Sequence, residues 1–370
     1  MSNDVIFSRD LAGIEVGETH ISDVKGEEGL LSYRGYSIES LATKPFWQIV
    51  WLVLFGSWPD ADQDKALNEF MAANSQLPPE ELQLLETLPR NLHPMLMLQG
   101  VVPLLQLKPA EQIAGLSETA HQGLLIAARI PSLVASWRQL QLGNTPLPSN
   151  PAVSFHENFL TMFNGHAPTA DQVKVLDTAQ ILQMEHSFNA GTFAGRVCAS
   201  TLAPIQSSIS ASIGTLFGVL HGGADQAALE MAQKIGSPAL AADHVRNVLA
   251  QKQKIMGMGH REYKVVDPRA RILKPMAKAL CKSGEAKNLF EILEAVEAAC
   301  QVEFSKSKKE IWANVEFYKG AVFHQLGIPS HYFTAIFAMA RVYGYIAHYM
   351  EFSKDSCLIR PRARYVGNAI

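Results

Sequence analysis

The segment Leu220-His221-Gly222-Gly223-Ala224 is followed about forty residues later by Gly257-Met258-Gly259-His260 and then by Asp267-Pro268-Arg269. Glycine has no side chain to block a ligand and adopts backbone conformations closed to other residues. A histidine among glycines can therefore meet something other than protein. Either histidine alone would more simply cap a helix near a tight turn. The pair, with an arginine in register, indicates a functional site.

Composition limits the classes of function. A chain of 370 residues is long enough for a large core and for two domains. Lys and Arg number 32 against 35 Asp and Glu, a formal charge of -3, so there is no general electrostatic attraction for nucleic acid. The four cysteines have no paired metal spacing, and they are typical of reduced thiols in a cytoplasmic protein without a metal site.

The start of the chain and its apolar segments predict neither export nor membrane insertion. Residues 1–4 lack the basic start and apolar run of a signal peptide, so we expect a cytoplasmic location. The longest apolar stretch, Phe46 to Phe55, is far shorter than the roughly 20 residues that span a bilayer. We expect it to form a buried helix.

The spacing of apolar residues is helical along most of the chain. Leu176, Ala179 and Leu182 fall near one helix face, as does a series running from Leu289 to Cys300. The fold class is therefore mainly α. Short strands are expected at Ile14–Val16 and Leu30–Tyr33. No repeat of 20 to 50 residues is present, which disfavours a helical solenoid.

Several motifs, in order along the chain, resemble the citrate synthase family, which includes 2-methylcitrate synthase. Besides the three segments above, with Arg261 to Lys264 and Ala270 extending two of them, they are Tyr33-Arg34-Gly35-Tyr36, Glu185 to Ala190, Asn314-Val315-Glu316-Phe317-Tyr318 and Ile359-Arg360-Pro361-Arg362. The resemblance implies a two-domain helical fold. Residues 1–221 and 328–370 would form the large domain and residues 222–327 the small one, with the active site in the cleft between them.

The resemblance also implies a reaction and assigns catalytic residues. Joining an acetyl thioester to a ketone needs a carboxylate to remove a methyl proton, a donor at the thioester oxygen and a donor at the ketone. Glu316 would abstract the proton, His221 would hold the thioester carbonyl, and His260 would polarise the ketone of oxaloacetate. Hydrolysis of the resulting thioester would release citrate and CoA.

Four further residues would bind oxaloacetate by resemblance: His186, Arg269, Arg341 and Arg360, the last supplied across a homodimer interface. Arginine suits this role because its planar fork matches a carboxylate. Other interpretations stay open for three of them. His186 could be a satisfied core histidine, Arg341 a helix-surface residue, and Arg360 part of a solvated basic tail.

The coenzyme site is predicted at the second glycine motif. Backbone donors would come from Ile255, Met256, Gly257, Met258 and Gly259, and positive charge from Arg261 and Lys264, as the phosphates of CoA require. No Rossmann or P-loop pattern accompanies them. We therefore expect a CoA thioester as co-substrate, no tightly bound cofactor and no catalytic metal.

Departures from the family pattern keep alternatives open. Glu316 stands where the family usually has Asp, and Leu96 and Gln99 stand where it usually has Asp and Arg. Near Ser75, many relatives have an arginine. The first hypothesis is condensation of acetyl-CoA with oxaloacetate. Propionyl-CoA is a close alternative donor, because apolar pockets discriminate one methylene poorly. A third hypothesis is a catalytically weakened paralogue that binds CoA and acts in regulation.

The chain starts almost directly with the segment shared with the family, so we expect a dimer without NADH control.

Overall fold

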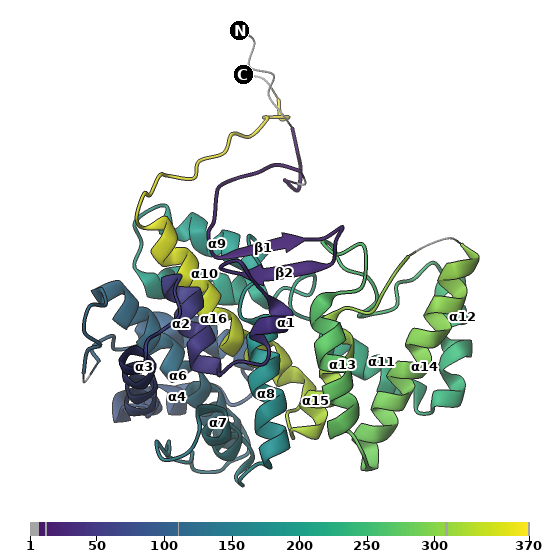
Figure 1. Ribbon diagram of the computed structural model, residues 1–370, viewed down its shortest axis with the longest axis horizontal. Helices are drawn as coiled ribbons and strands as arrows, with labels where there is room; N and C mark the ends of the chain where they lie inside the picture. The colour runs from purple at the N-terminus through teal and green to yellow at the C-terminus, as the bar shows by residue number, and fades with distance from the viewer. Residues whose placement is uncertain (1–6, 12, 110, 308–309, 369–370) are drawn as a thin grey trace.

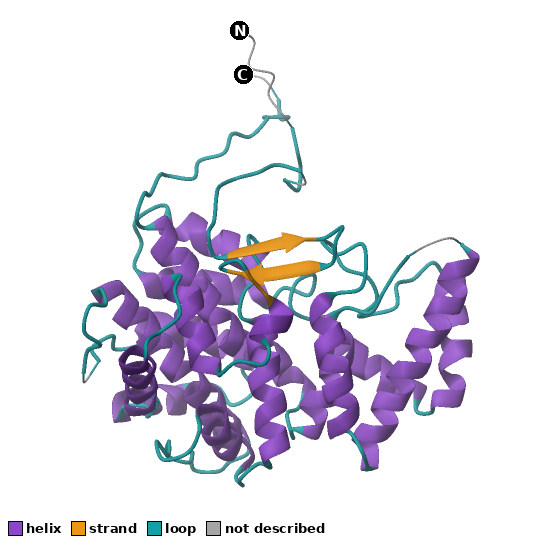
Figure 2. Cartoon of the chain, in the orientation of Figure 1, coloured by secondary structure: helices purple, strands orange, loops and turns teal. Residues whose placement is uncertain are grey.

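The computed structural model describes residues 7–11, 13–109, 111–307 and 310–368, and most of them are helical (Figures 1 and 2). The mainly α prediction is confirmed. Two groups of helices are visible in Figure 1: a larger one that includes the first helices of the chain and the last one, and a smaller one that includes the helices between residues 224 and 306.

A small antiparallel sheet lies near the start of the chain. Strand β1 (Ser22–Lys25) pairs with β2 (Leu30–Tyr33), and β2 pairs with β3 (Tyr36–Ser37). The predicted strand at Leu30–Tyr33 is confirmed, but the one at Ile14–Val16 is wrong. That segment is extended and unpaired, and Val16 is exposed. The turn through Gly29, whose φ is +66°, instead folds Ser22–Lys25 back onto β2.

The helices follow in chain order. They are α1 (Ile38–Leu41), α2 (Phe46–Phe55), α3 (Ala61–Asn74), α4 (Pro79–Thr87), α5 (Pro94–Val101), α6 (Glu118–Gln141), α7 (Phe155–Asn164), α8 (Ala170–Gln183), α9 (Ala190–Ala199), α10 (Ile205–Leu216), α11 (Ala224–Ile235), α12 (Ala241–Ala250), α13 (Pro268–Leu280), α14 (Gly284–Lys306), α15 (Val315–Gln325) and α16 (Phe333–Phe352). The described ranges also contain three short 3-10 helices, η1 (Val102–Leu104), η2 (Pro238–Leu240) and η3 (Ser330–Tyr332).

Local sequence explains where several helices begin and end. The apolar stretch Phe46 to Phe55 is the buried helix α2, as predicted, and it stops where Gly56 takes a left-handed φ of +85°. Helices α3 and α8 begin with capping boxes, in which Asp60 or Thr169 bonds reciprocally with a glutamine three residues on.

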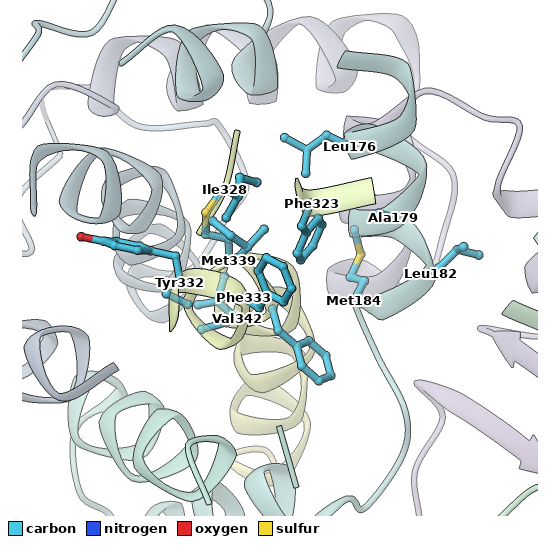
Figure 3. Close-up of a cluster of buried hydrophobic side chains, with 14 of the residues drawn as sticks. Leu176, Ala179, Leu182, Met184, Phe323, Ile328, Tyr332, Phe333, Met339 and Val342 are labelled. Carbon is cyan, nitrogen blue, oxygen red and sulfur yellow. The ribbon is translucent and has the colours of Figure 1, made fainter. Parts of the chain in front are cut away.

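Helix α16 is the centre of the larger group, and it packs against α2, α6, α8, α9 and α10. Figure 3 shows the predicted face of α8, with Leu176 and Ala179, near Phe333 and Val342 of α16. These side chains are fully or almost fully buried. The helical spacing read from the sequence is thus the spacing that fills the core.

The smaller group is built around α15, which packs against α11, α13 and α14. The predicted apolar face of α14, from Leu289 to Cys300, is buried there. Helix α13 also contacts α8 of the larger group, so the two groups meet near the start of α15. Within the described ranges, no helix is long and apolar enough to cross a membrane.

Candidate active site

The structure brings together three of the predicted histidines from distant parts of the chain. His186 follows α8, His221 lies in the turn before α11, and His260 lies between α12 and α13. The ring centroids of His186 and His260 are 5.5 Å apart. Tyr263 joins them, because its hydroxyl lies 3.1 Å from Nε2 of His186 and its ring packs against His260. Tyr263 belongs to the extension of the second glycine motif, but the sequence alone did not indicate a role for it.

His260 is held as a neutral donor. Its Nδ1 accepts hydrogen bonds from the backbone N–H groups of Glu262 (3.0 Å) and Tyr263 (3.3 Å), so in the neutral ring the proton sits on Nε2. Burial and the nearby Arg269 lower its pKa to about 4. Nη2 of Arg269 lies 3.4 Å from that Nε2. Two donors therefore face each other, an arrangement suited to an acceptor oxygen of a ligand.

Asp267 fixes Arg269 and two helix ends at once. Its carboxylate accepts two bonds from the Arg269 guanidinium, from Nε at 3.0 Å and Nη2 at 2.8 Å. It also accepts from the backbone N–H of Arg269 (3.0 Å) in α13 and of Val315 (3.1 Å) in α15. Both side chains are buried, which by itself disfavours their charged forms. Their mutual attraction is stronger, so the pKa of Asp267 is lowered and the pKa of Arg269 is raised. The arginine is thus a fixed cation beside His260.

Glu316 lies in the first turn of α15, where Asn314 caps the helix by accepting from the Glu316 N–H at 3.0 Å. Its Oε1 accepts from Nε2 of Gln183 at 2.9 Å, and its Oε2 pairs with Lys319. The side chain is 14% exposed. Its charge is felt by both His221 and His260, so the carboxylate lies within electrostatic reach of both rings.

His221 is anchored at the start of α9. Its Nε2 lies 3.2 Å from Oδ1 of Asn189 and 3.3 Å from the N–H of Gly191. Burial and then Arg341 lower its pKa to about 4, which favours the neutral ring. Nε2 is thus engaged with the start of α9, and the ring also bonds to the backbone of His221 itself.

Arg341 is buried, at 2% exposure, so the interpretation as a helix-surface residue is wrong. Its Nε donates to the carbonyl of Gln183 at 2.7 Å, and its guanidinium lies 4.7 Å from the ring centroid of Phe337. Its charge contributes to lowering the pKa of His186 and His221. Arg341 therefore belongs to the same cluster.

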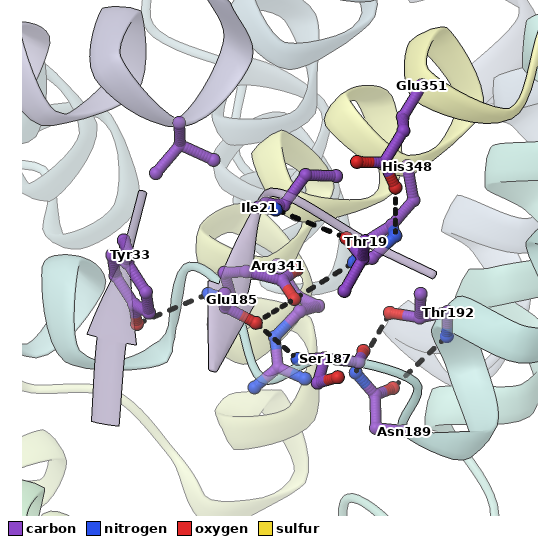
Figure 4. Close-up of polar contacts among 12 residues, drawn as sticks. Thr19, Ile21, Tyr33, Glu185, Ser187, Asn189, Thr192, Arg341, His348 and Glu351 are labelled. Atoms are coloured by element: carbon purple, nitrogen blue, oxygen red, sulfur yellow. Dashed lines mark hydrogen bonds and ion pairs between the residues drawn. The ribbon is translucent and has the colours of Figure 1, made fainter. Parts of the chain in front are cut away.

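A second layer of buried polar groups surrounds Arg341 (Figure 4). Oε1 of Glu185 accepts from the hydroxyl of Ser22 (3.0 Å) and lies 3.0 Å from Nε2 of His348. The backbone N–H of Glu185 in turn donates to the Tyr33 hydroxyl at 3.3 Å. Sequence reasoning gave these residues no role. Their only signal was that Tyr33 and Glu185 fall inside the quoted motifs.

Arg360 does not join the cluster within this chain. It is exposed, in the segment after α16 that extends away from the helices beside the start of the chain (Figure 1). Its Nη1 donates to the carbonyl of the adjacent Pro361 at 3.0 Å. A role in a neighbouring subunit's site stays a prediction.

A cavity of about 1040 Å³ opens beside His260 and includes most of the predicted coenzyme residues. Its walls contain Ile255, Met258, Gly259, Arg261 and Lys264. The walls also include Leu249, Lys254, Phe304, Ile311 and Trp312, which sequence reasoning missed because they belong to no glycine motif.

Two predicted coenzyme residues do not line this cavity: Met256, which is 38% exposed, and Gly257. Gly257 instead brings the loop against α15. Its φ is +78°, its carbonyl accepts from the N–H of Asn314 at 3.0 Å, and a Cβ there would lie 2.7 Å from Cδ2 of Phe317. The glycine therefore couples the cavity wall to the start of the helix that carries Glu316.

Comparison with known proteins gives consistent relatives. The sequence profile described as "Citrate synthase, C-terminal domain" matches residues 10–362. The chain is 38% identical to a citrate synthase of Acidithiobacillus ferridurans, over 98% of this chain and 95% of the relative. It is 35% identical to a 2-methylcitrate synthase of Shewanella oneidensis, over 96% and 94%. The structure of a ternary complex of Thermoplasma acidophilum citrate synthase with carboxymethyl coenzyme A and oxaloacetate superimposes with a TM-score of 0.90, at 29% identity, over 99% of this chain and 97% of that one.

Proposed function

Because this chain belongs to the citrate synthase family, we propose that it condenses acetyl-CoA with oxaloacetate and hydrolyses the product to citrate and CoA. The observation that carries the proposal is the pair of donors formed by His260 Nε2 and Arg269 Nη2, 3.4 Å apart, with a carboxylate base nearby. Oxaloacetate is a ketone with carboxylates on both sides, so its oxygens can accept hydrogen bonds from these two donors.

Oxaloacetate would bind first to the fixed cations. Arg269, oriented by Asp267, and Arg341, oriented by the Gln183 carbonyl, are buried guanidinium groups suited to its two carboxylates. Neutral His186 would add a hydrogen bond, and His260 Nε2–H would polarise the ketone. Their burial excludes water, which strengthens each interaction.

Carbon–carbon bond formation would then use Glu316 and His221. Glu316 removes a proton from the thioester methyl group, while the imidazole of His221 holds the carbonyl oxygen on which charge develops. The enol carbon attacks the ketone carbon of oxaloacetate, and the former ketone oxygen takes a proton to become the hydroxyl of citryl-CoA. Water then cleaves the C–S bond, giving citrate and free CoA thiol.

The cavity beside His260 supports a CoA thioester as co-substrate. That the protein needs no tightly bound cofactor or metal is part of the same proposal. Lys254, Arg261 and Lys264 bring positive charge to its wall, and Leu249 and Ile311 bring apolar surface. This mixture suits a ligand with phosphates at one end and an apolar arm. The thioester would then enter the site past Gly259 and His260.

The proposed organisation follows the family. We assign residues 1–221 and 328–370 to a large domain and residues 222–327 to a small one, supported by the packing of α11 to α14 around α15. A homodimer in which Arg360 reaches the partner's site, a place in the tricarboxylic acid cycle and a cytoplasmic location belong to the same proposal. The four free cysteines support the location, since reducing compartments keep thiols unpaired.

The test is CoA-thiol release from purified protein with oxaloacetate and either acetyl-CoA or propionyl-CoA, comparing kcat/KM. A preference for acetyl-CoA supports the proposal. A preference for propionyl-CoA would assign the 2-methylcitrate synthase activity named for the Shewanella oneidensis relative. Silence with both, from folded protein that binds CoA, would refute synthase activity and favour a weakened regulatory paralogue.

The Glu316→Gln variant separates a working base from a tolerated replacement. It keeps the length and the hydrogen-bonding reach of the side chain but cannot accept the methyl proton. If the native chain is active, this variant should lose at least about a hundredfold in kcat, the lower end of a general base's usual contribution. An unchanged kcat would remove Glu316 from the mechanism.

A further inference from the structure

Lys319 is a fully buried cation placed one helical turn after Glu316 on α15. It forms an ion pair with Oε2 of Glu316, and its Nζ lies 2.9 Å from Oδ2 of Asp225, which is also fully buried. The aliphatic stem and ammonium lie against the rings of Phe337 and Phe323, with Nζ at 4.5 and 5.4 Å from their centroids. One ammonium is thus shared by two carboxylates away from water.

The close packing of two helices makes this contact possible. Gly320 follows Lys319, and a Cβ at that position would lie 2.9 Å from Cβ of Leu229 and 3.1 Å from the carbonyl of Asp225. Because glycine has no Cβ, α15 approaches α11 closely enough for Lys319 to reach the first turn of that helix. Neither the proton transfer nor the binding of oxaloacetate described above uses Asp225 or Lys319.

The other charged groups around Glu316 leave Lys319 as its direct counter-charge. From α13, Arg269 is matched by Asp267. From α16, the buried Arg341 acts on Glu185, whose pKa it helps to lower, and its Nε donates to the Gln183 carbonyl. His221 before α11 and His260 before α13 are neutral near pH 7, because their pKa values lie at about 4. From α8, Gln183 contributes an uncharged amide to Oε1. Lys319 therefore anchors one oxygen of the carboxylate and Gln183 the other.

Asp225 moderates that anchor. An ammonium paired with a single carboxylate stabilises the charged form of that carboxylate and so makes it a weaker base. A second carboxylate on the same ammonium offsets part of this attraction. The two acids compete for one cation, because Lys319 Nζ contacts a carboxylate oxygen of each. Burial raises the pKa of Asp225, and the negative charge of Glu316 adds to that effect.

We propose that Lys319 is a positioning residue that orients and ionises the Glu316 carboxylate, and that Asp225 tunes its basicity by sharing the Lys319 charge. The inference rests on the proposed function of Glu316 as the base. It also explains how a glutamate, longer than the aspartate usual in the family, is held in one place: Gln183 holds one oxygen and Lys319 the other.

The test compares the pH dependence of kcat in the native protein and in Lys319→Met and Asp225→Asn. Removing the cation disfavours the ionised base, so Lys319→Met should move the acid limb of kcat up by about one pH unit and lower the plateau at least tenfold. Removing the competing carboxylate leaves the cation wholly to Glu316, so Asp225→Asn should move the limb down. KM for oxaloacetate should change less than about twofold in both.

Two controls keep the result interpretable. Lys287→Met removes an exposed lysine paired with Glu291 on α14 and should leave the profile unchanged. The double variant Lys319→Met with Asp225→Asn removes the buried pair together, so it should fold even where Lys319→Met alone is too unstable to purify. In that case Asp225→Asn and the double variant decide, and the double variant should place the limb above that of Asp225→Asn.

Limbs that move in the same direction in Asp225→Asn and in Lys319→Met, or that do not move, would overturn the proposal, and so would a double variant whose limb lies at or below that of Asp225→Asn. An infrared titration distinguishes this from failure of the proposed function. The carboxylate band that Glu316→Gln abolishes is followed against pH in each folded variant, without turnover. In this titration too, the carboxylate band should shift to higher pH in Lys319→Met and to lower pH in Asp225→Asn. If the native protein releases no CoA, the synthase activity is refuted, but the effect of Lys319 and Asp225 on Glu316 is still measured by the band.

Discussion

Asp267→Asn should be among the most destabilising single changes in the site, because one buried carboxylate serves four donors. Asparagine keeps an oxygen where Oδ1 accepts from the N–H and Nε of Arg269. Its amide, however, presents hydrogens where Oδ2 now accepts from Arg269 Nη2 and the Val315 N–H. The variant loses those two bonds and leaves a buried guanidinium without its counter-ion.

The magnitude follows from these contacts. Each hydrogen bond to a charged group contributes about 1.5–3 kcal/mol, so two amount to roughly 3–6 kcal/mol. Breaking a buried ion pair by removing one partner independently costs about 3–5 kcal/mol. We therefore expect the free energy of unfolding to fall by about 3–5 kcal/mol. Since the Val315 bond also sets the start of α15, kcat/KM for oxaloacetate should fall with it.

The assay is urea unfolding followed by circular dichroism at a fixed protein concentration, because any dimer makes stability concentration-dependent. Asp243→Asn is the matched control: it breaks an ion pair with Arg246 whose side chains are 66% and 55% exposed. That change should cost no more than about 1 kcal/mol. If Asp267→Asn costs no more than the control, the four-donor account is refuted.

Three further predictions concern the base, the cavity loop and the histidines. Glu316→Asp should lower kcat about a hundredfold in the thiol-release assay, because the carboxylate retreats by one methylene; a gain would mean that the native chain is impaired. Gly257→Ala adds a close contact to a left-handed φ, so in urea unfolding it should lose more stability than Gly236→Ala, where φ is +73° and the nearest atom is 4.0 Å away; equal losses would contradict this. His221 and His260 protonate at about pH 6.5 when unfolded but near 4 when folded, so stability should fall as pH drops from about 6.5 to 4, by up to about 1.4 kcal/mol per pH unit for each histidine. The slope should be shallower in His221→Gln, and an identical slope would exclude the shift.

Much of the fold was readable from local sequence. The apolar run at Phe46–Phe55 and the spacing of Leu176, Ala179 and Leu182 predict buried helices, because a helix must turn its apolar face to the core. The prediction of a strand at Ile14–Val16 was wrong, because local spacing does not show which segments pair. Strand formation needs a partner, and the turn at Gly29 provides one to Ser22–Lys25 instead.

The sequence by itself determined the family, the helical class and the identity of the histidines, arginines and carboxylate with suitable chemistry, because motifs fix residue types at fixed spacing. Tertiary structure decided which of them meet. Only the fold shows that Arg341 is buried, that Asp267 ties α13 to α15, and that Lys319 is shared by Glu316 and Asp225. The energy of interaction between two charges depends on the distance between them and on the exclusion of water, and the order of residues along the chain specifies neither.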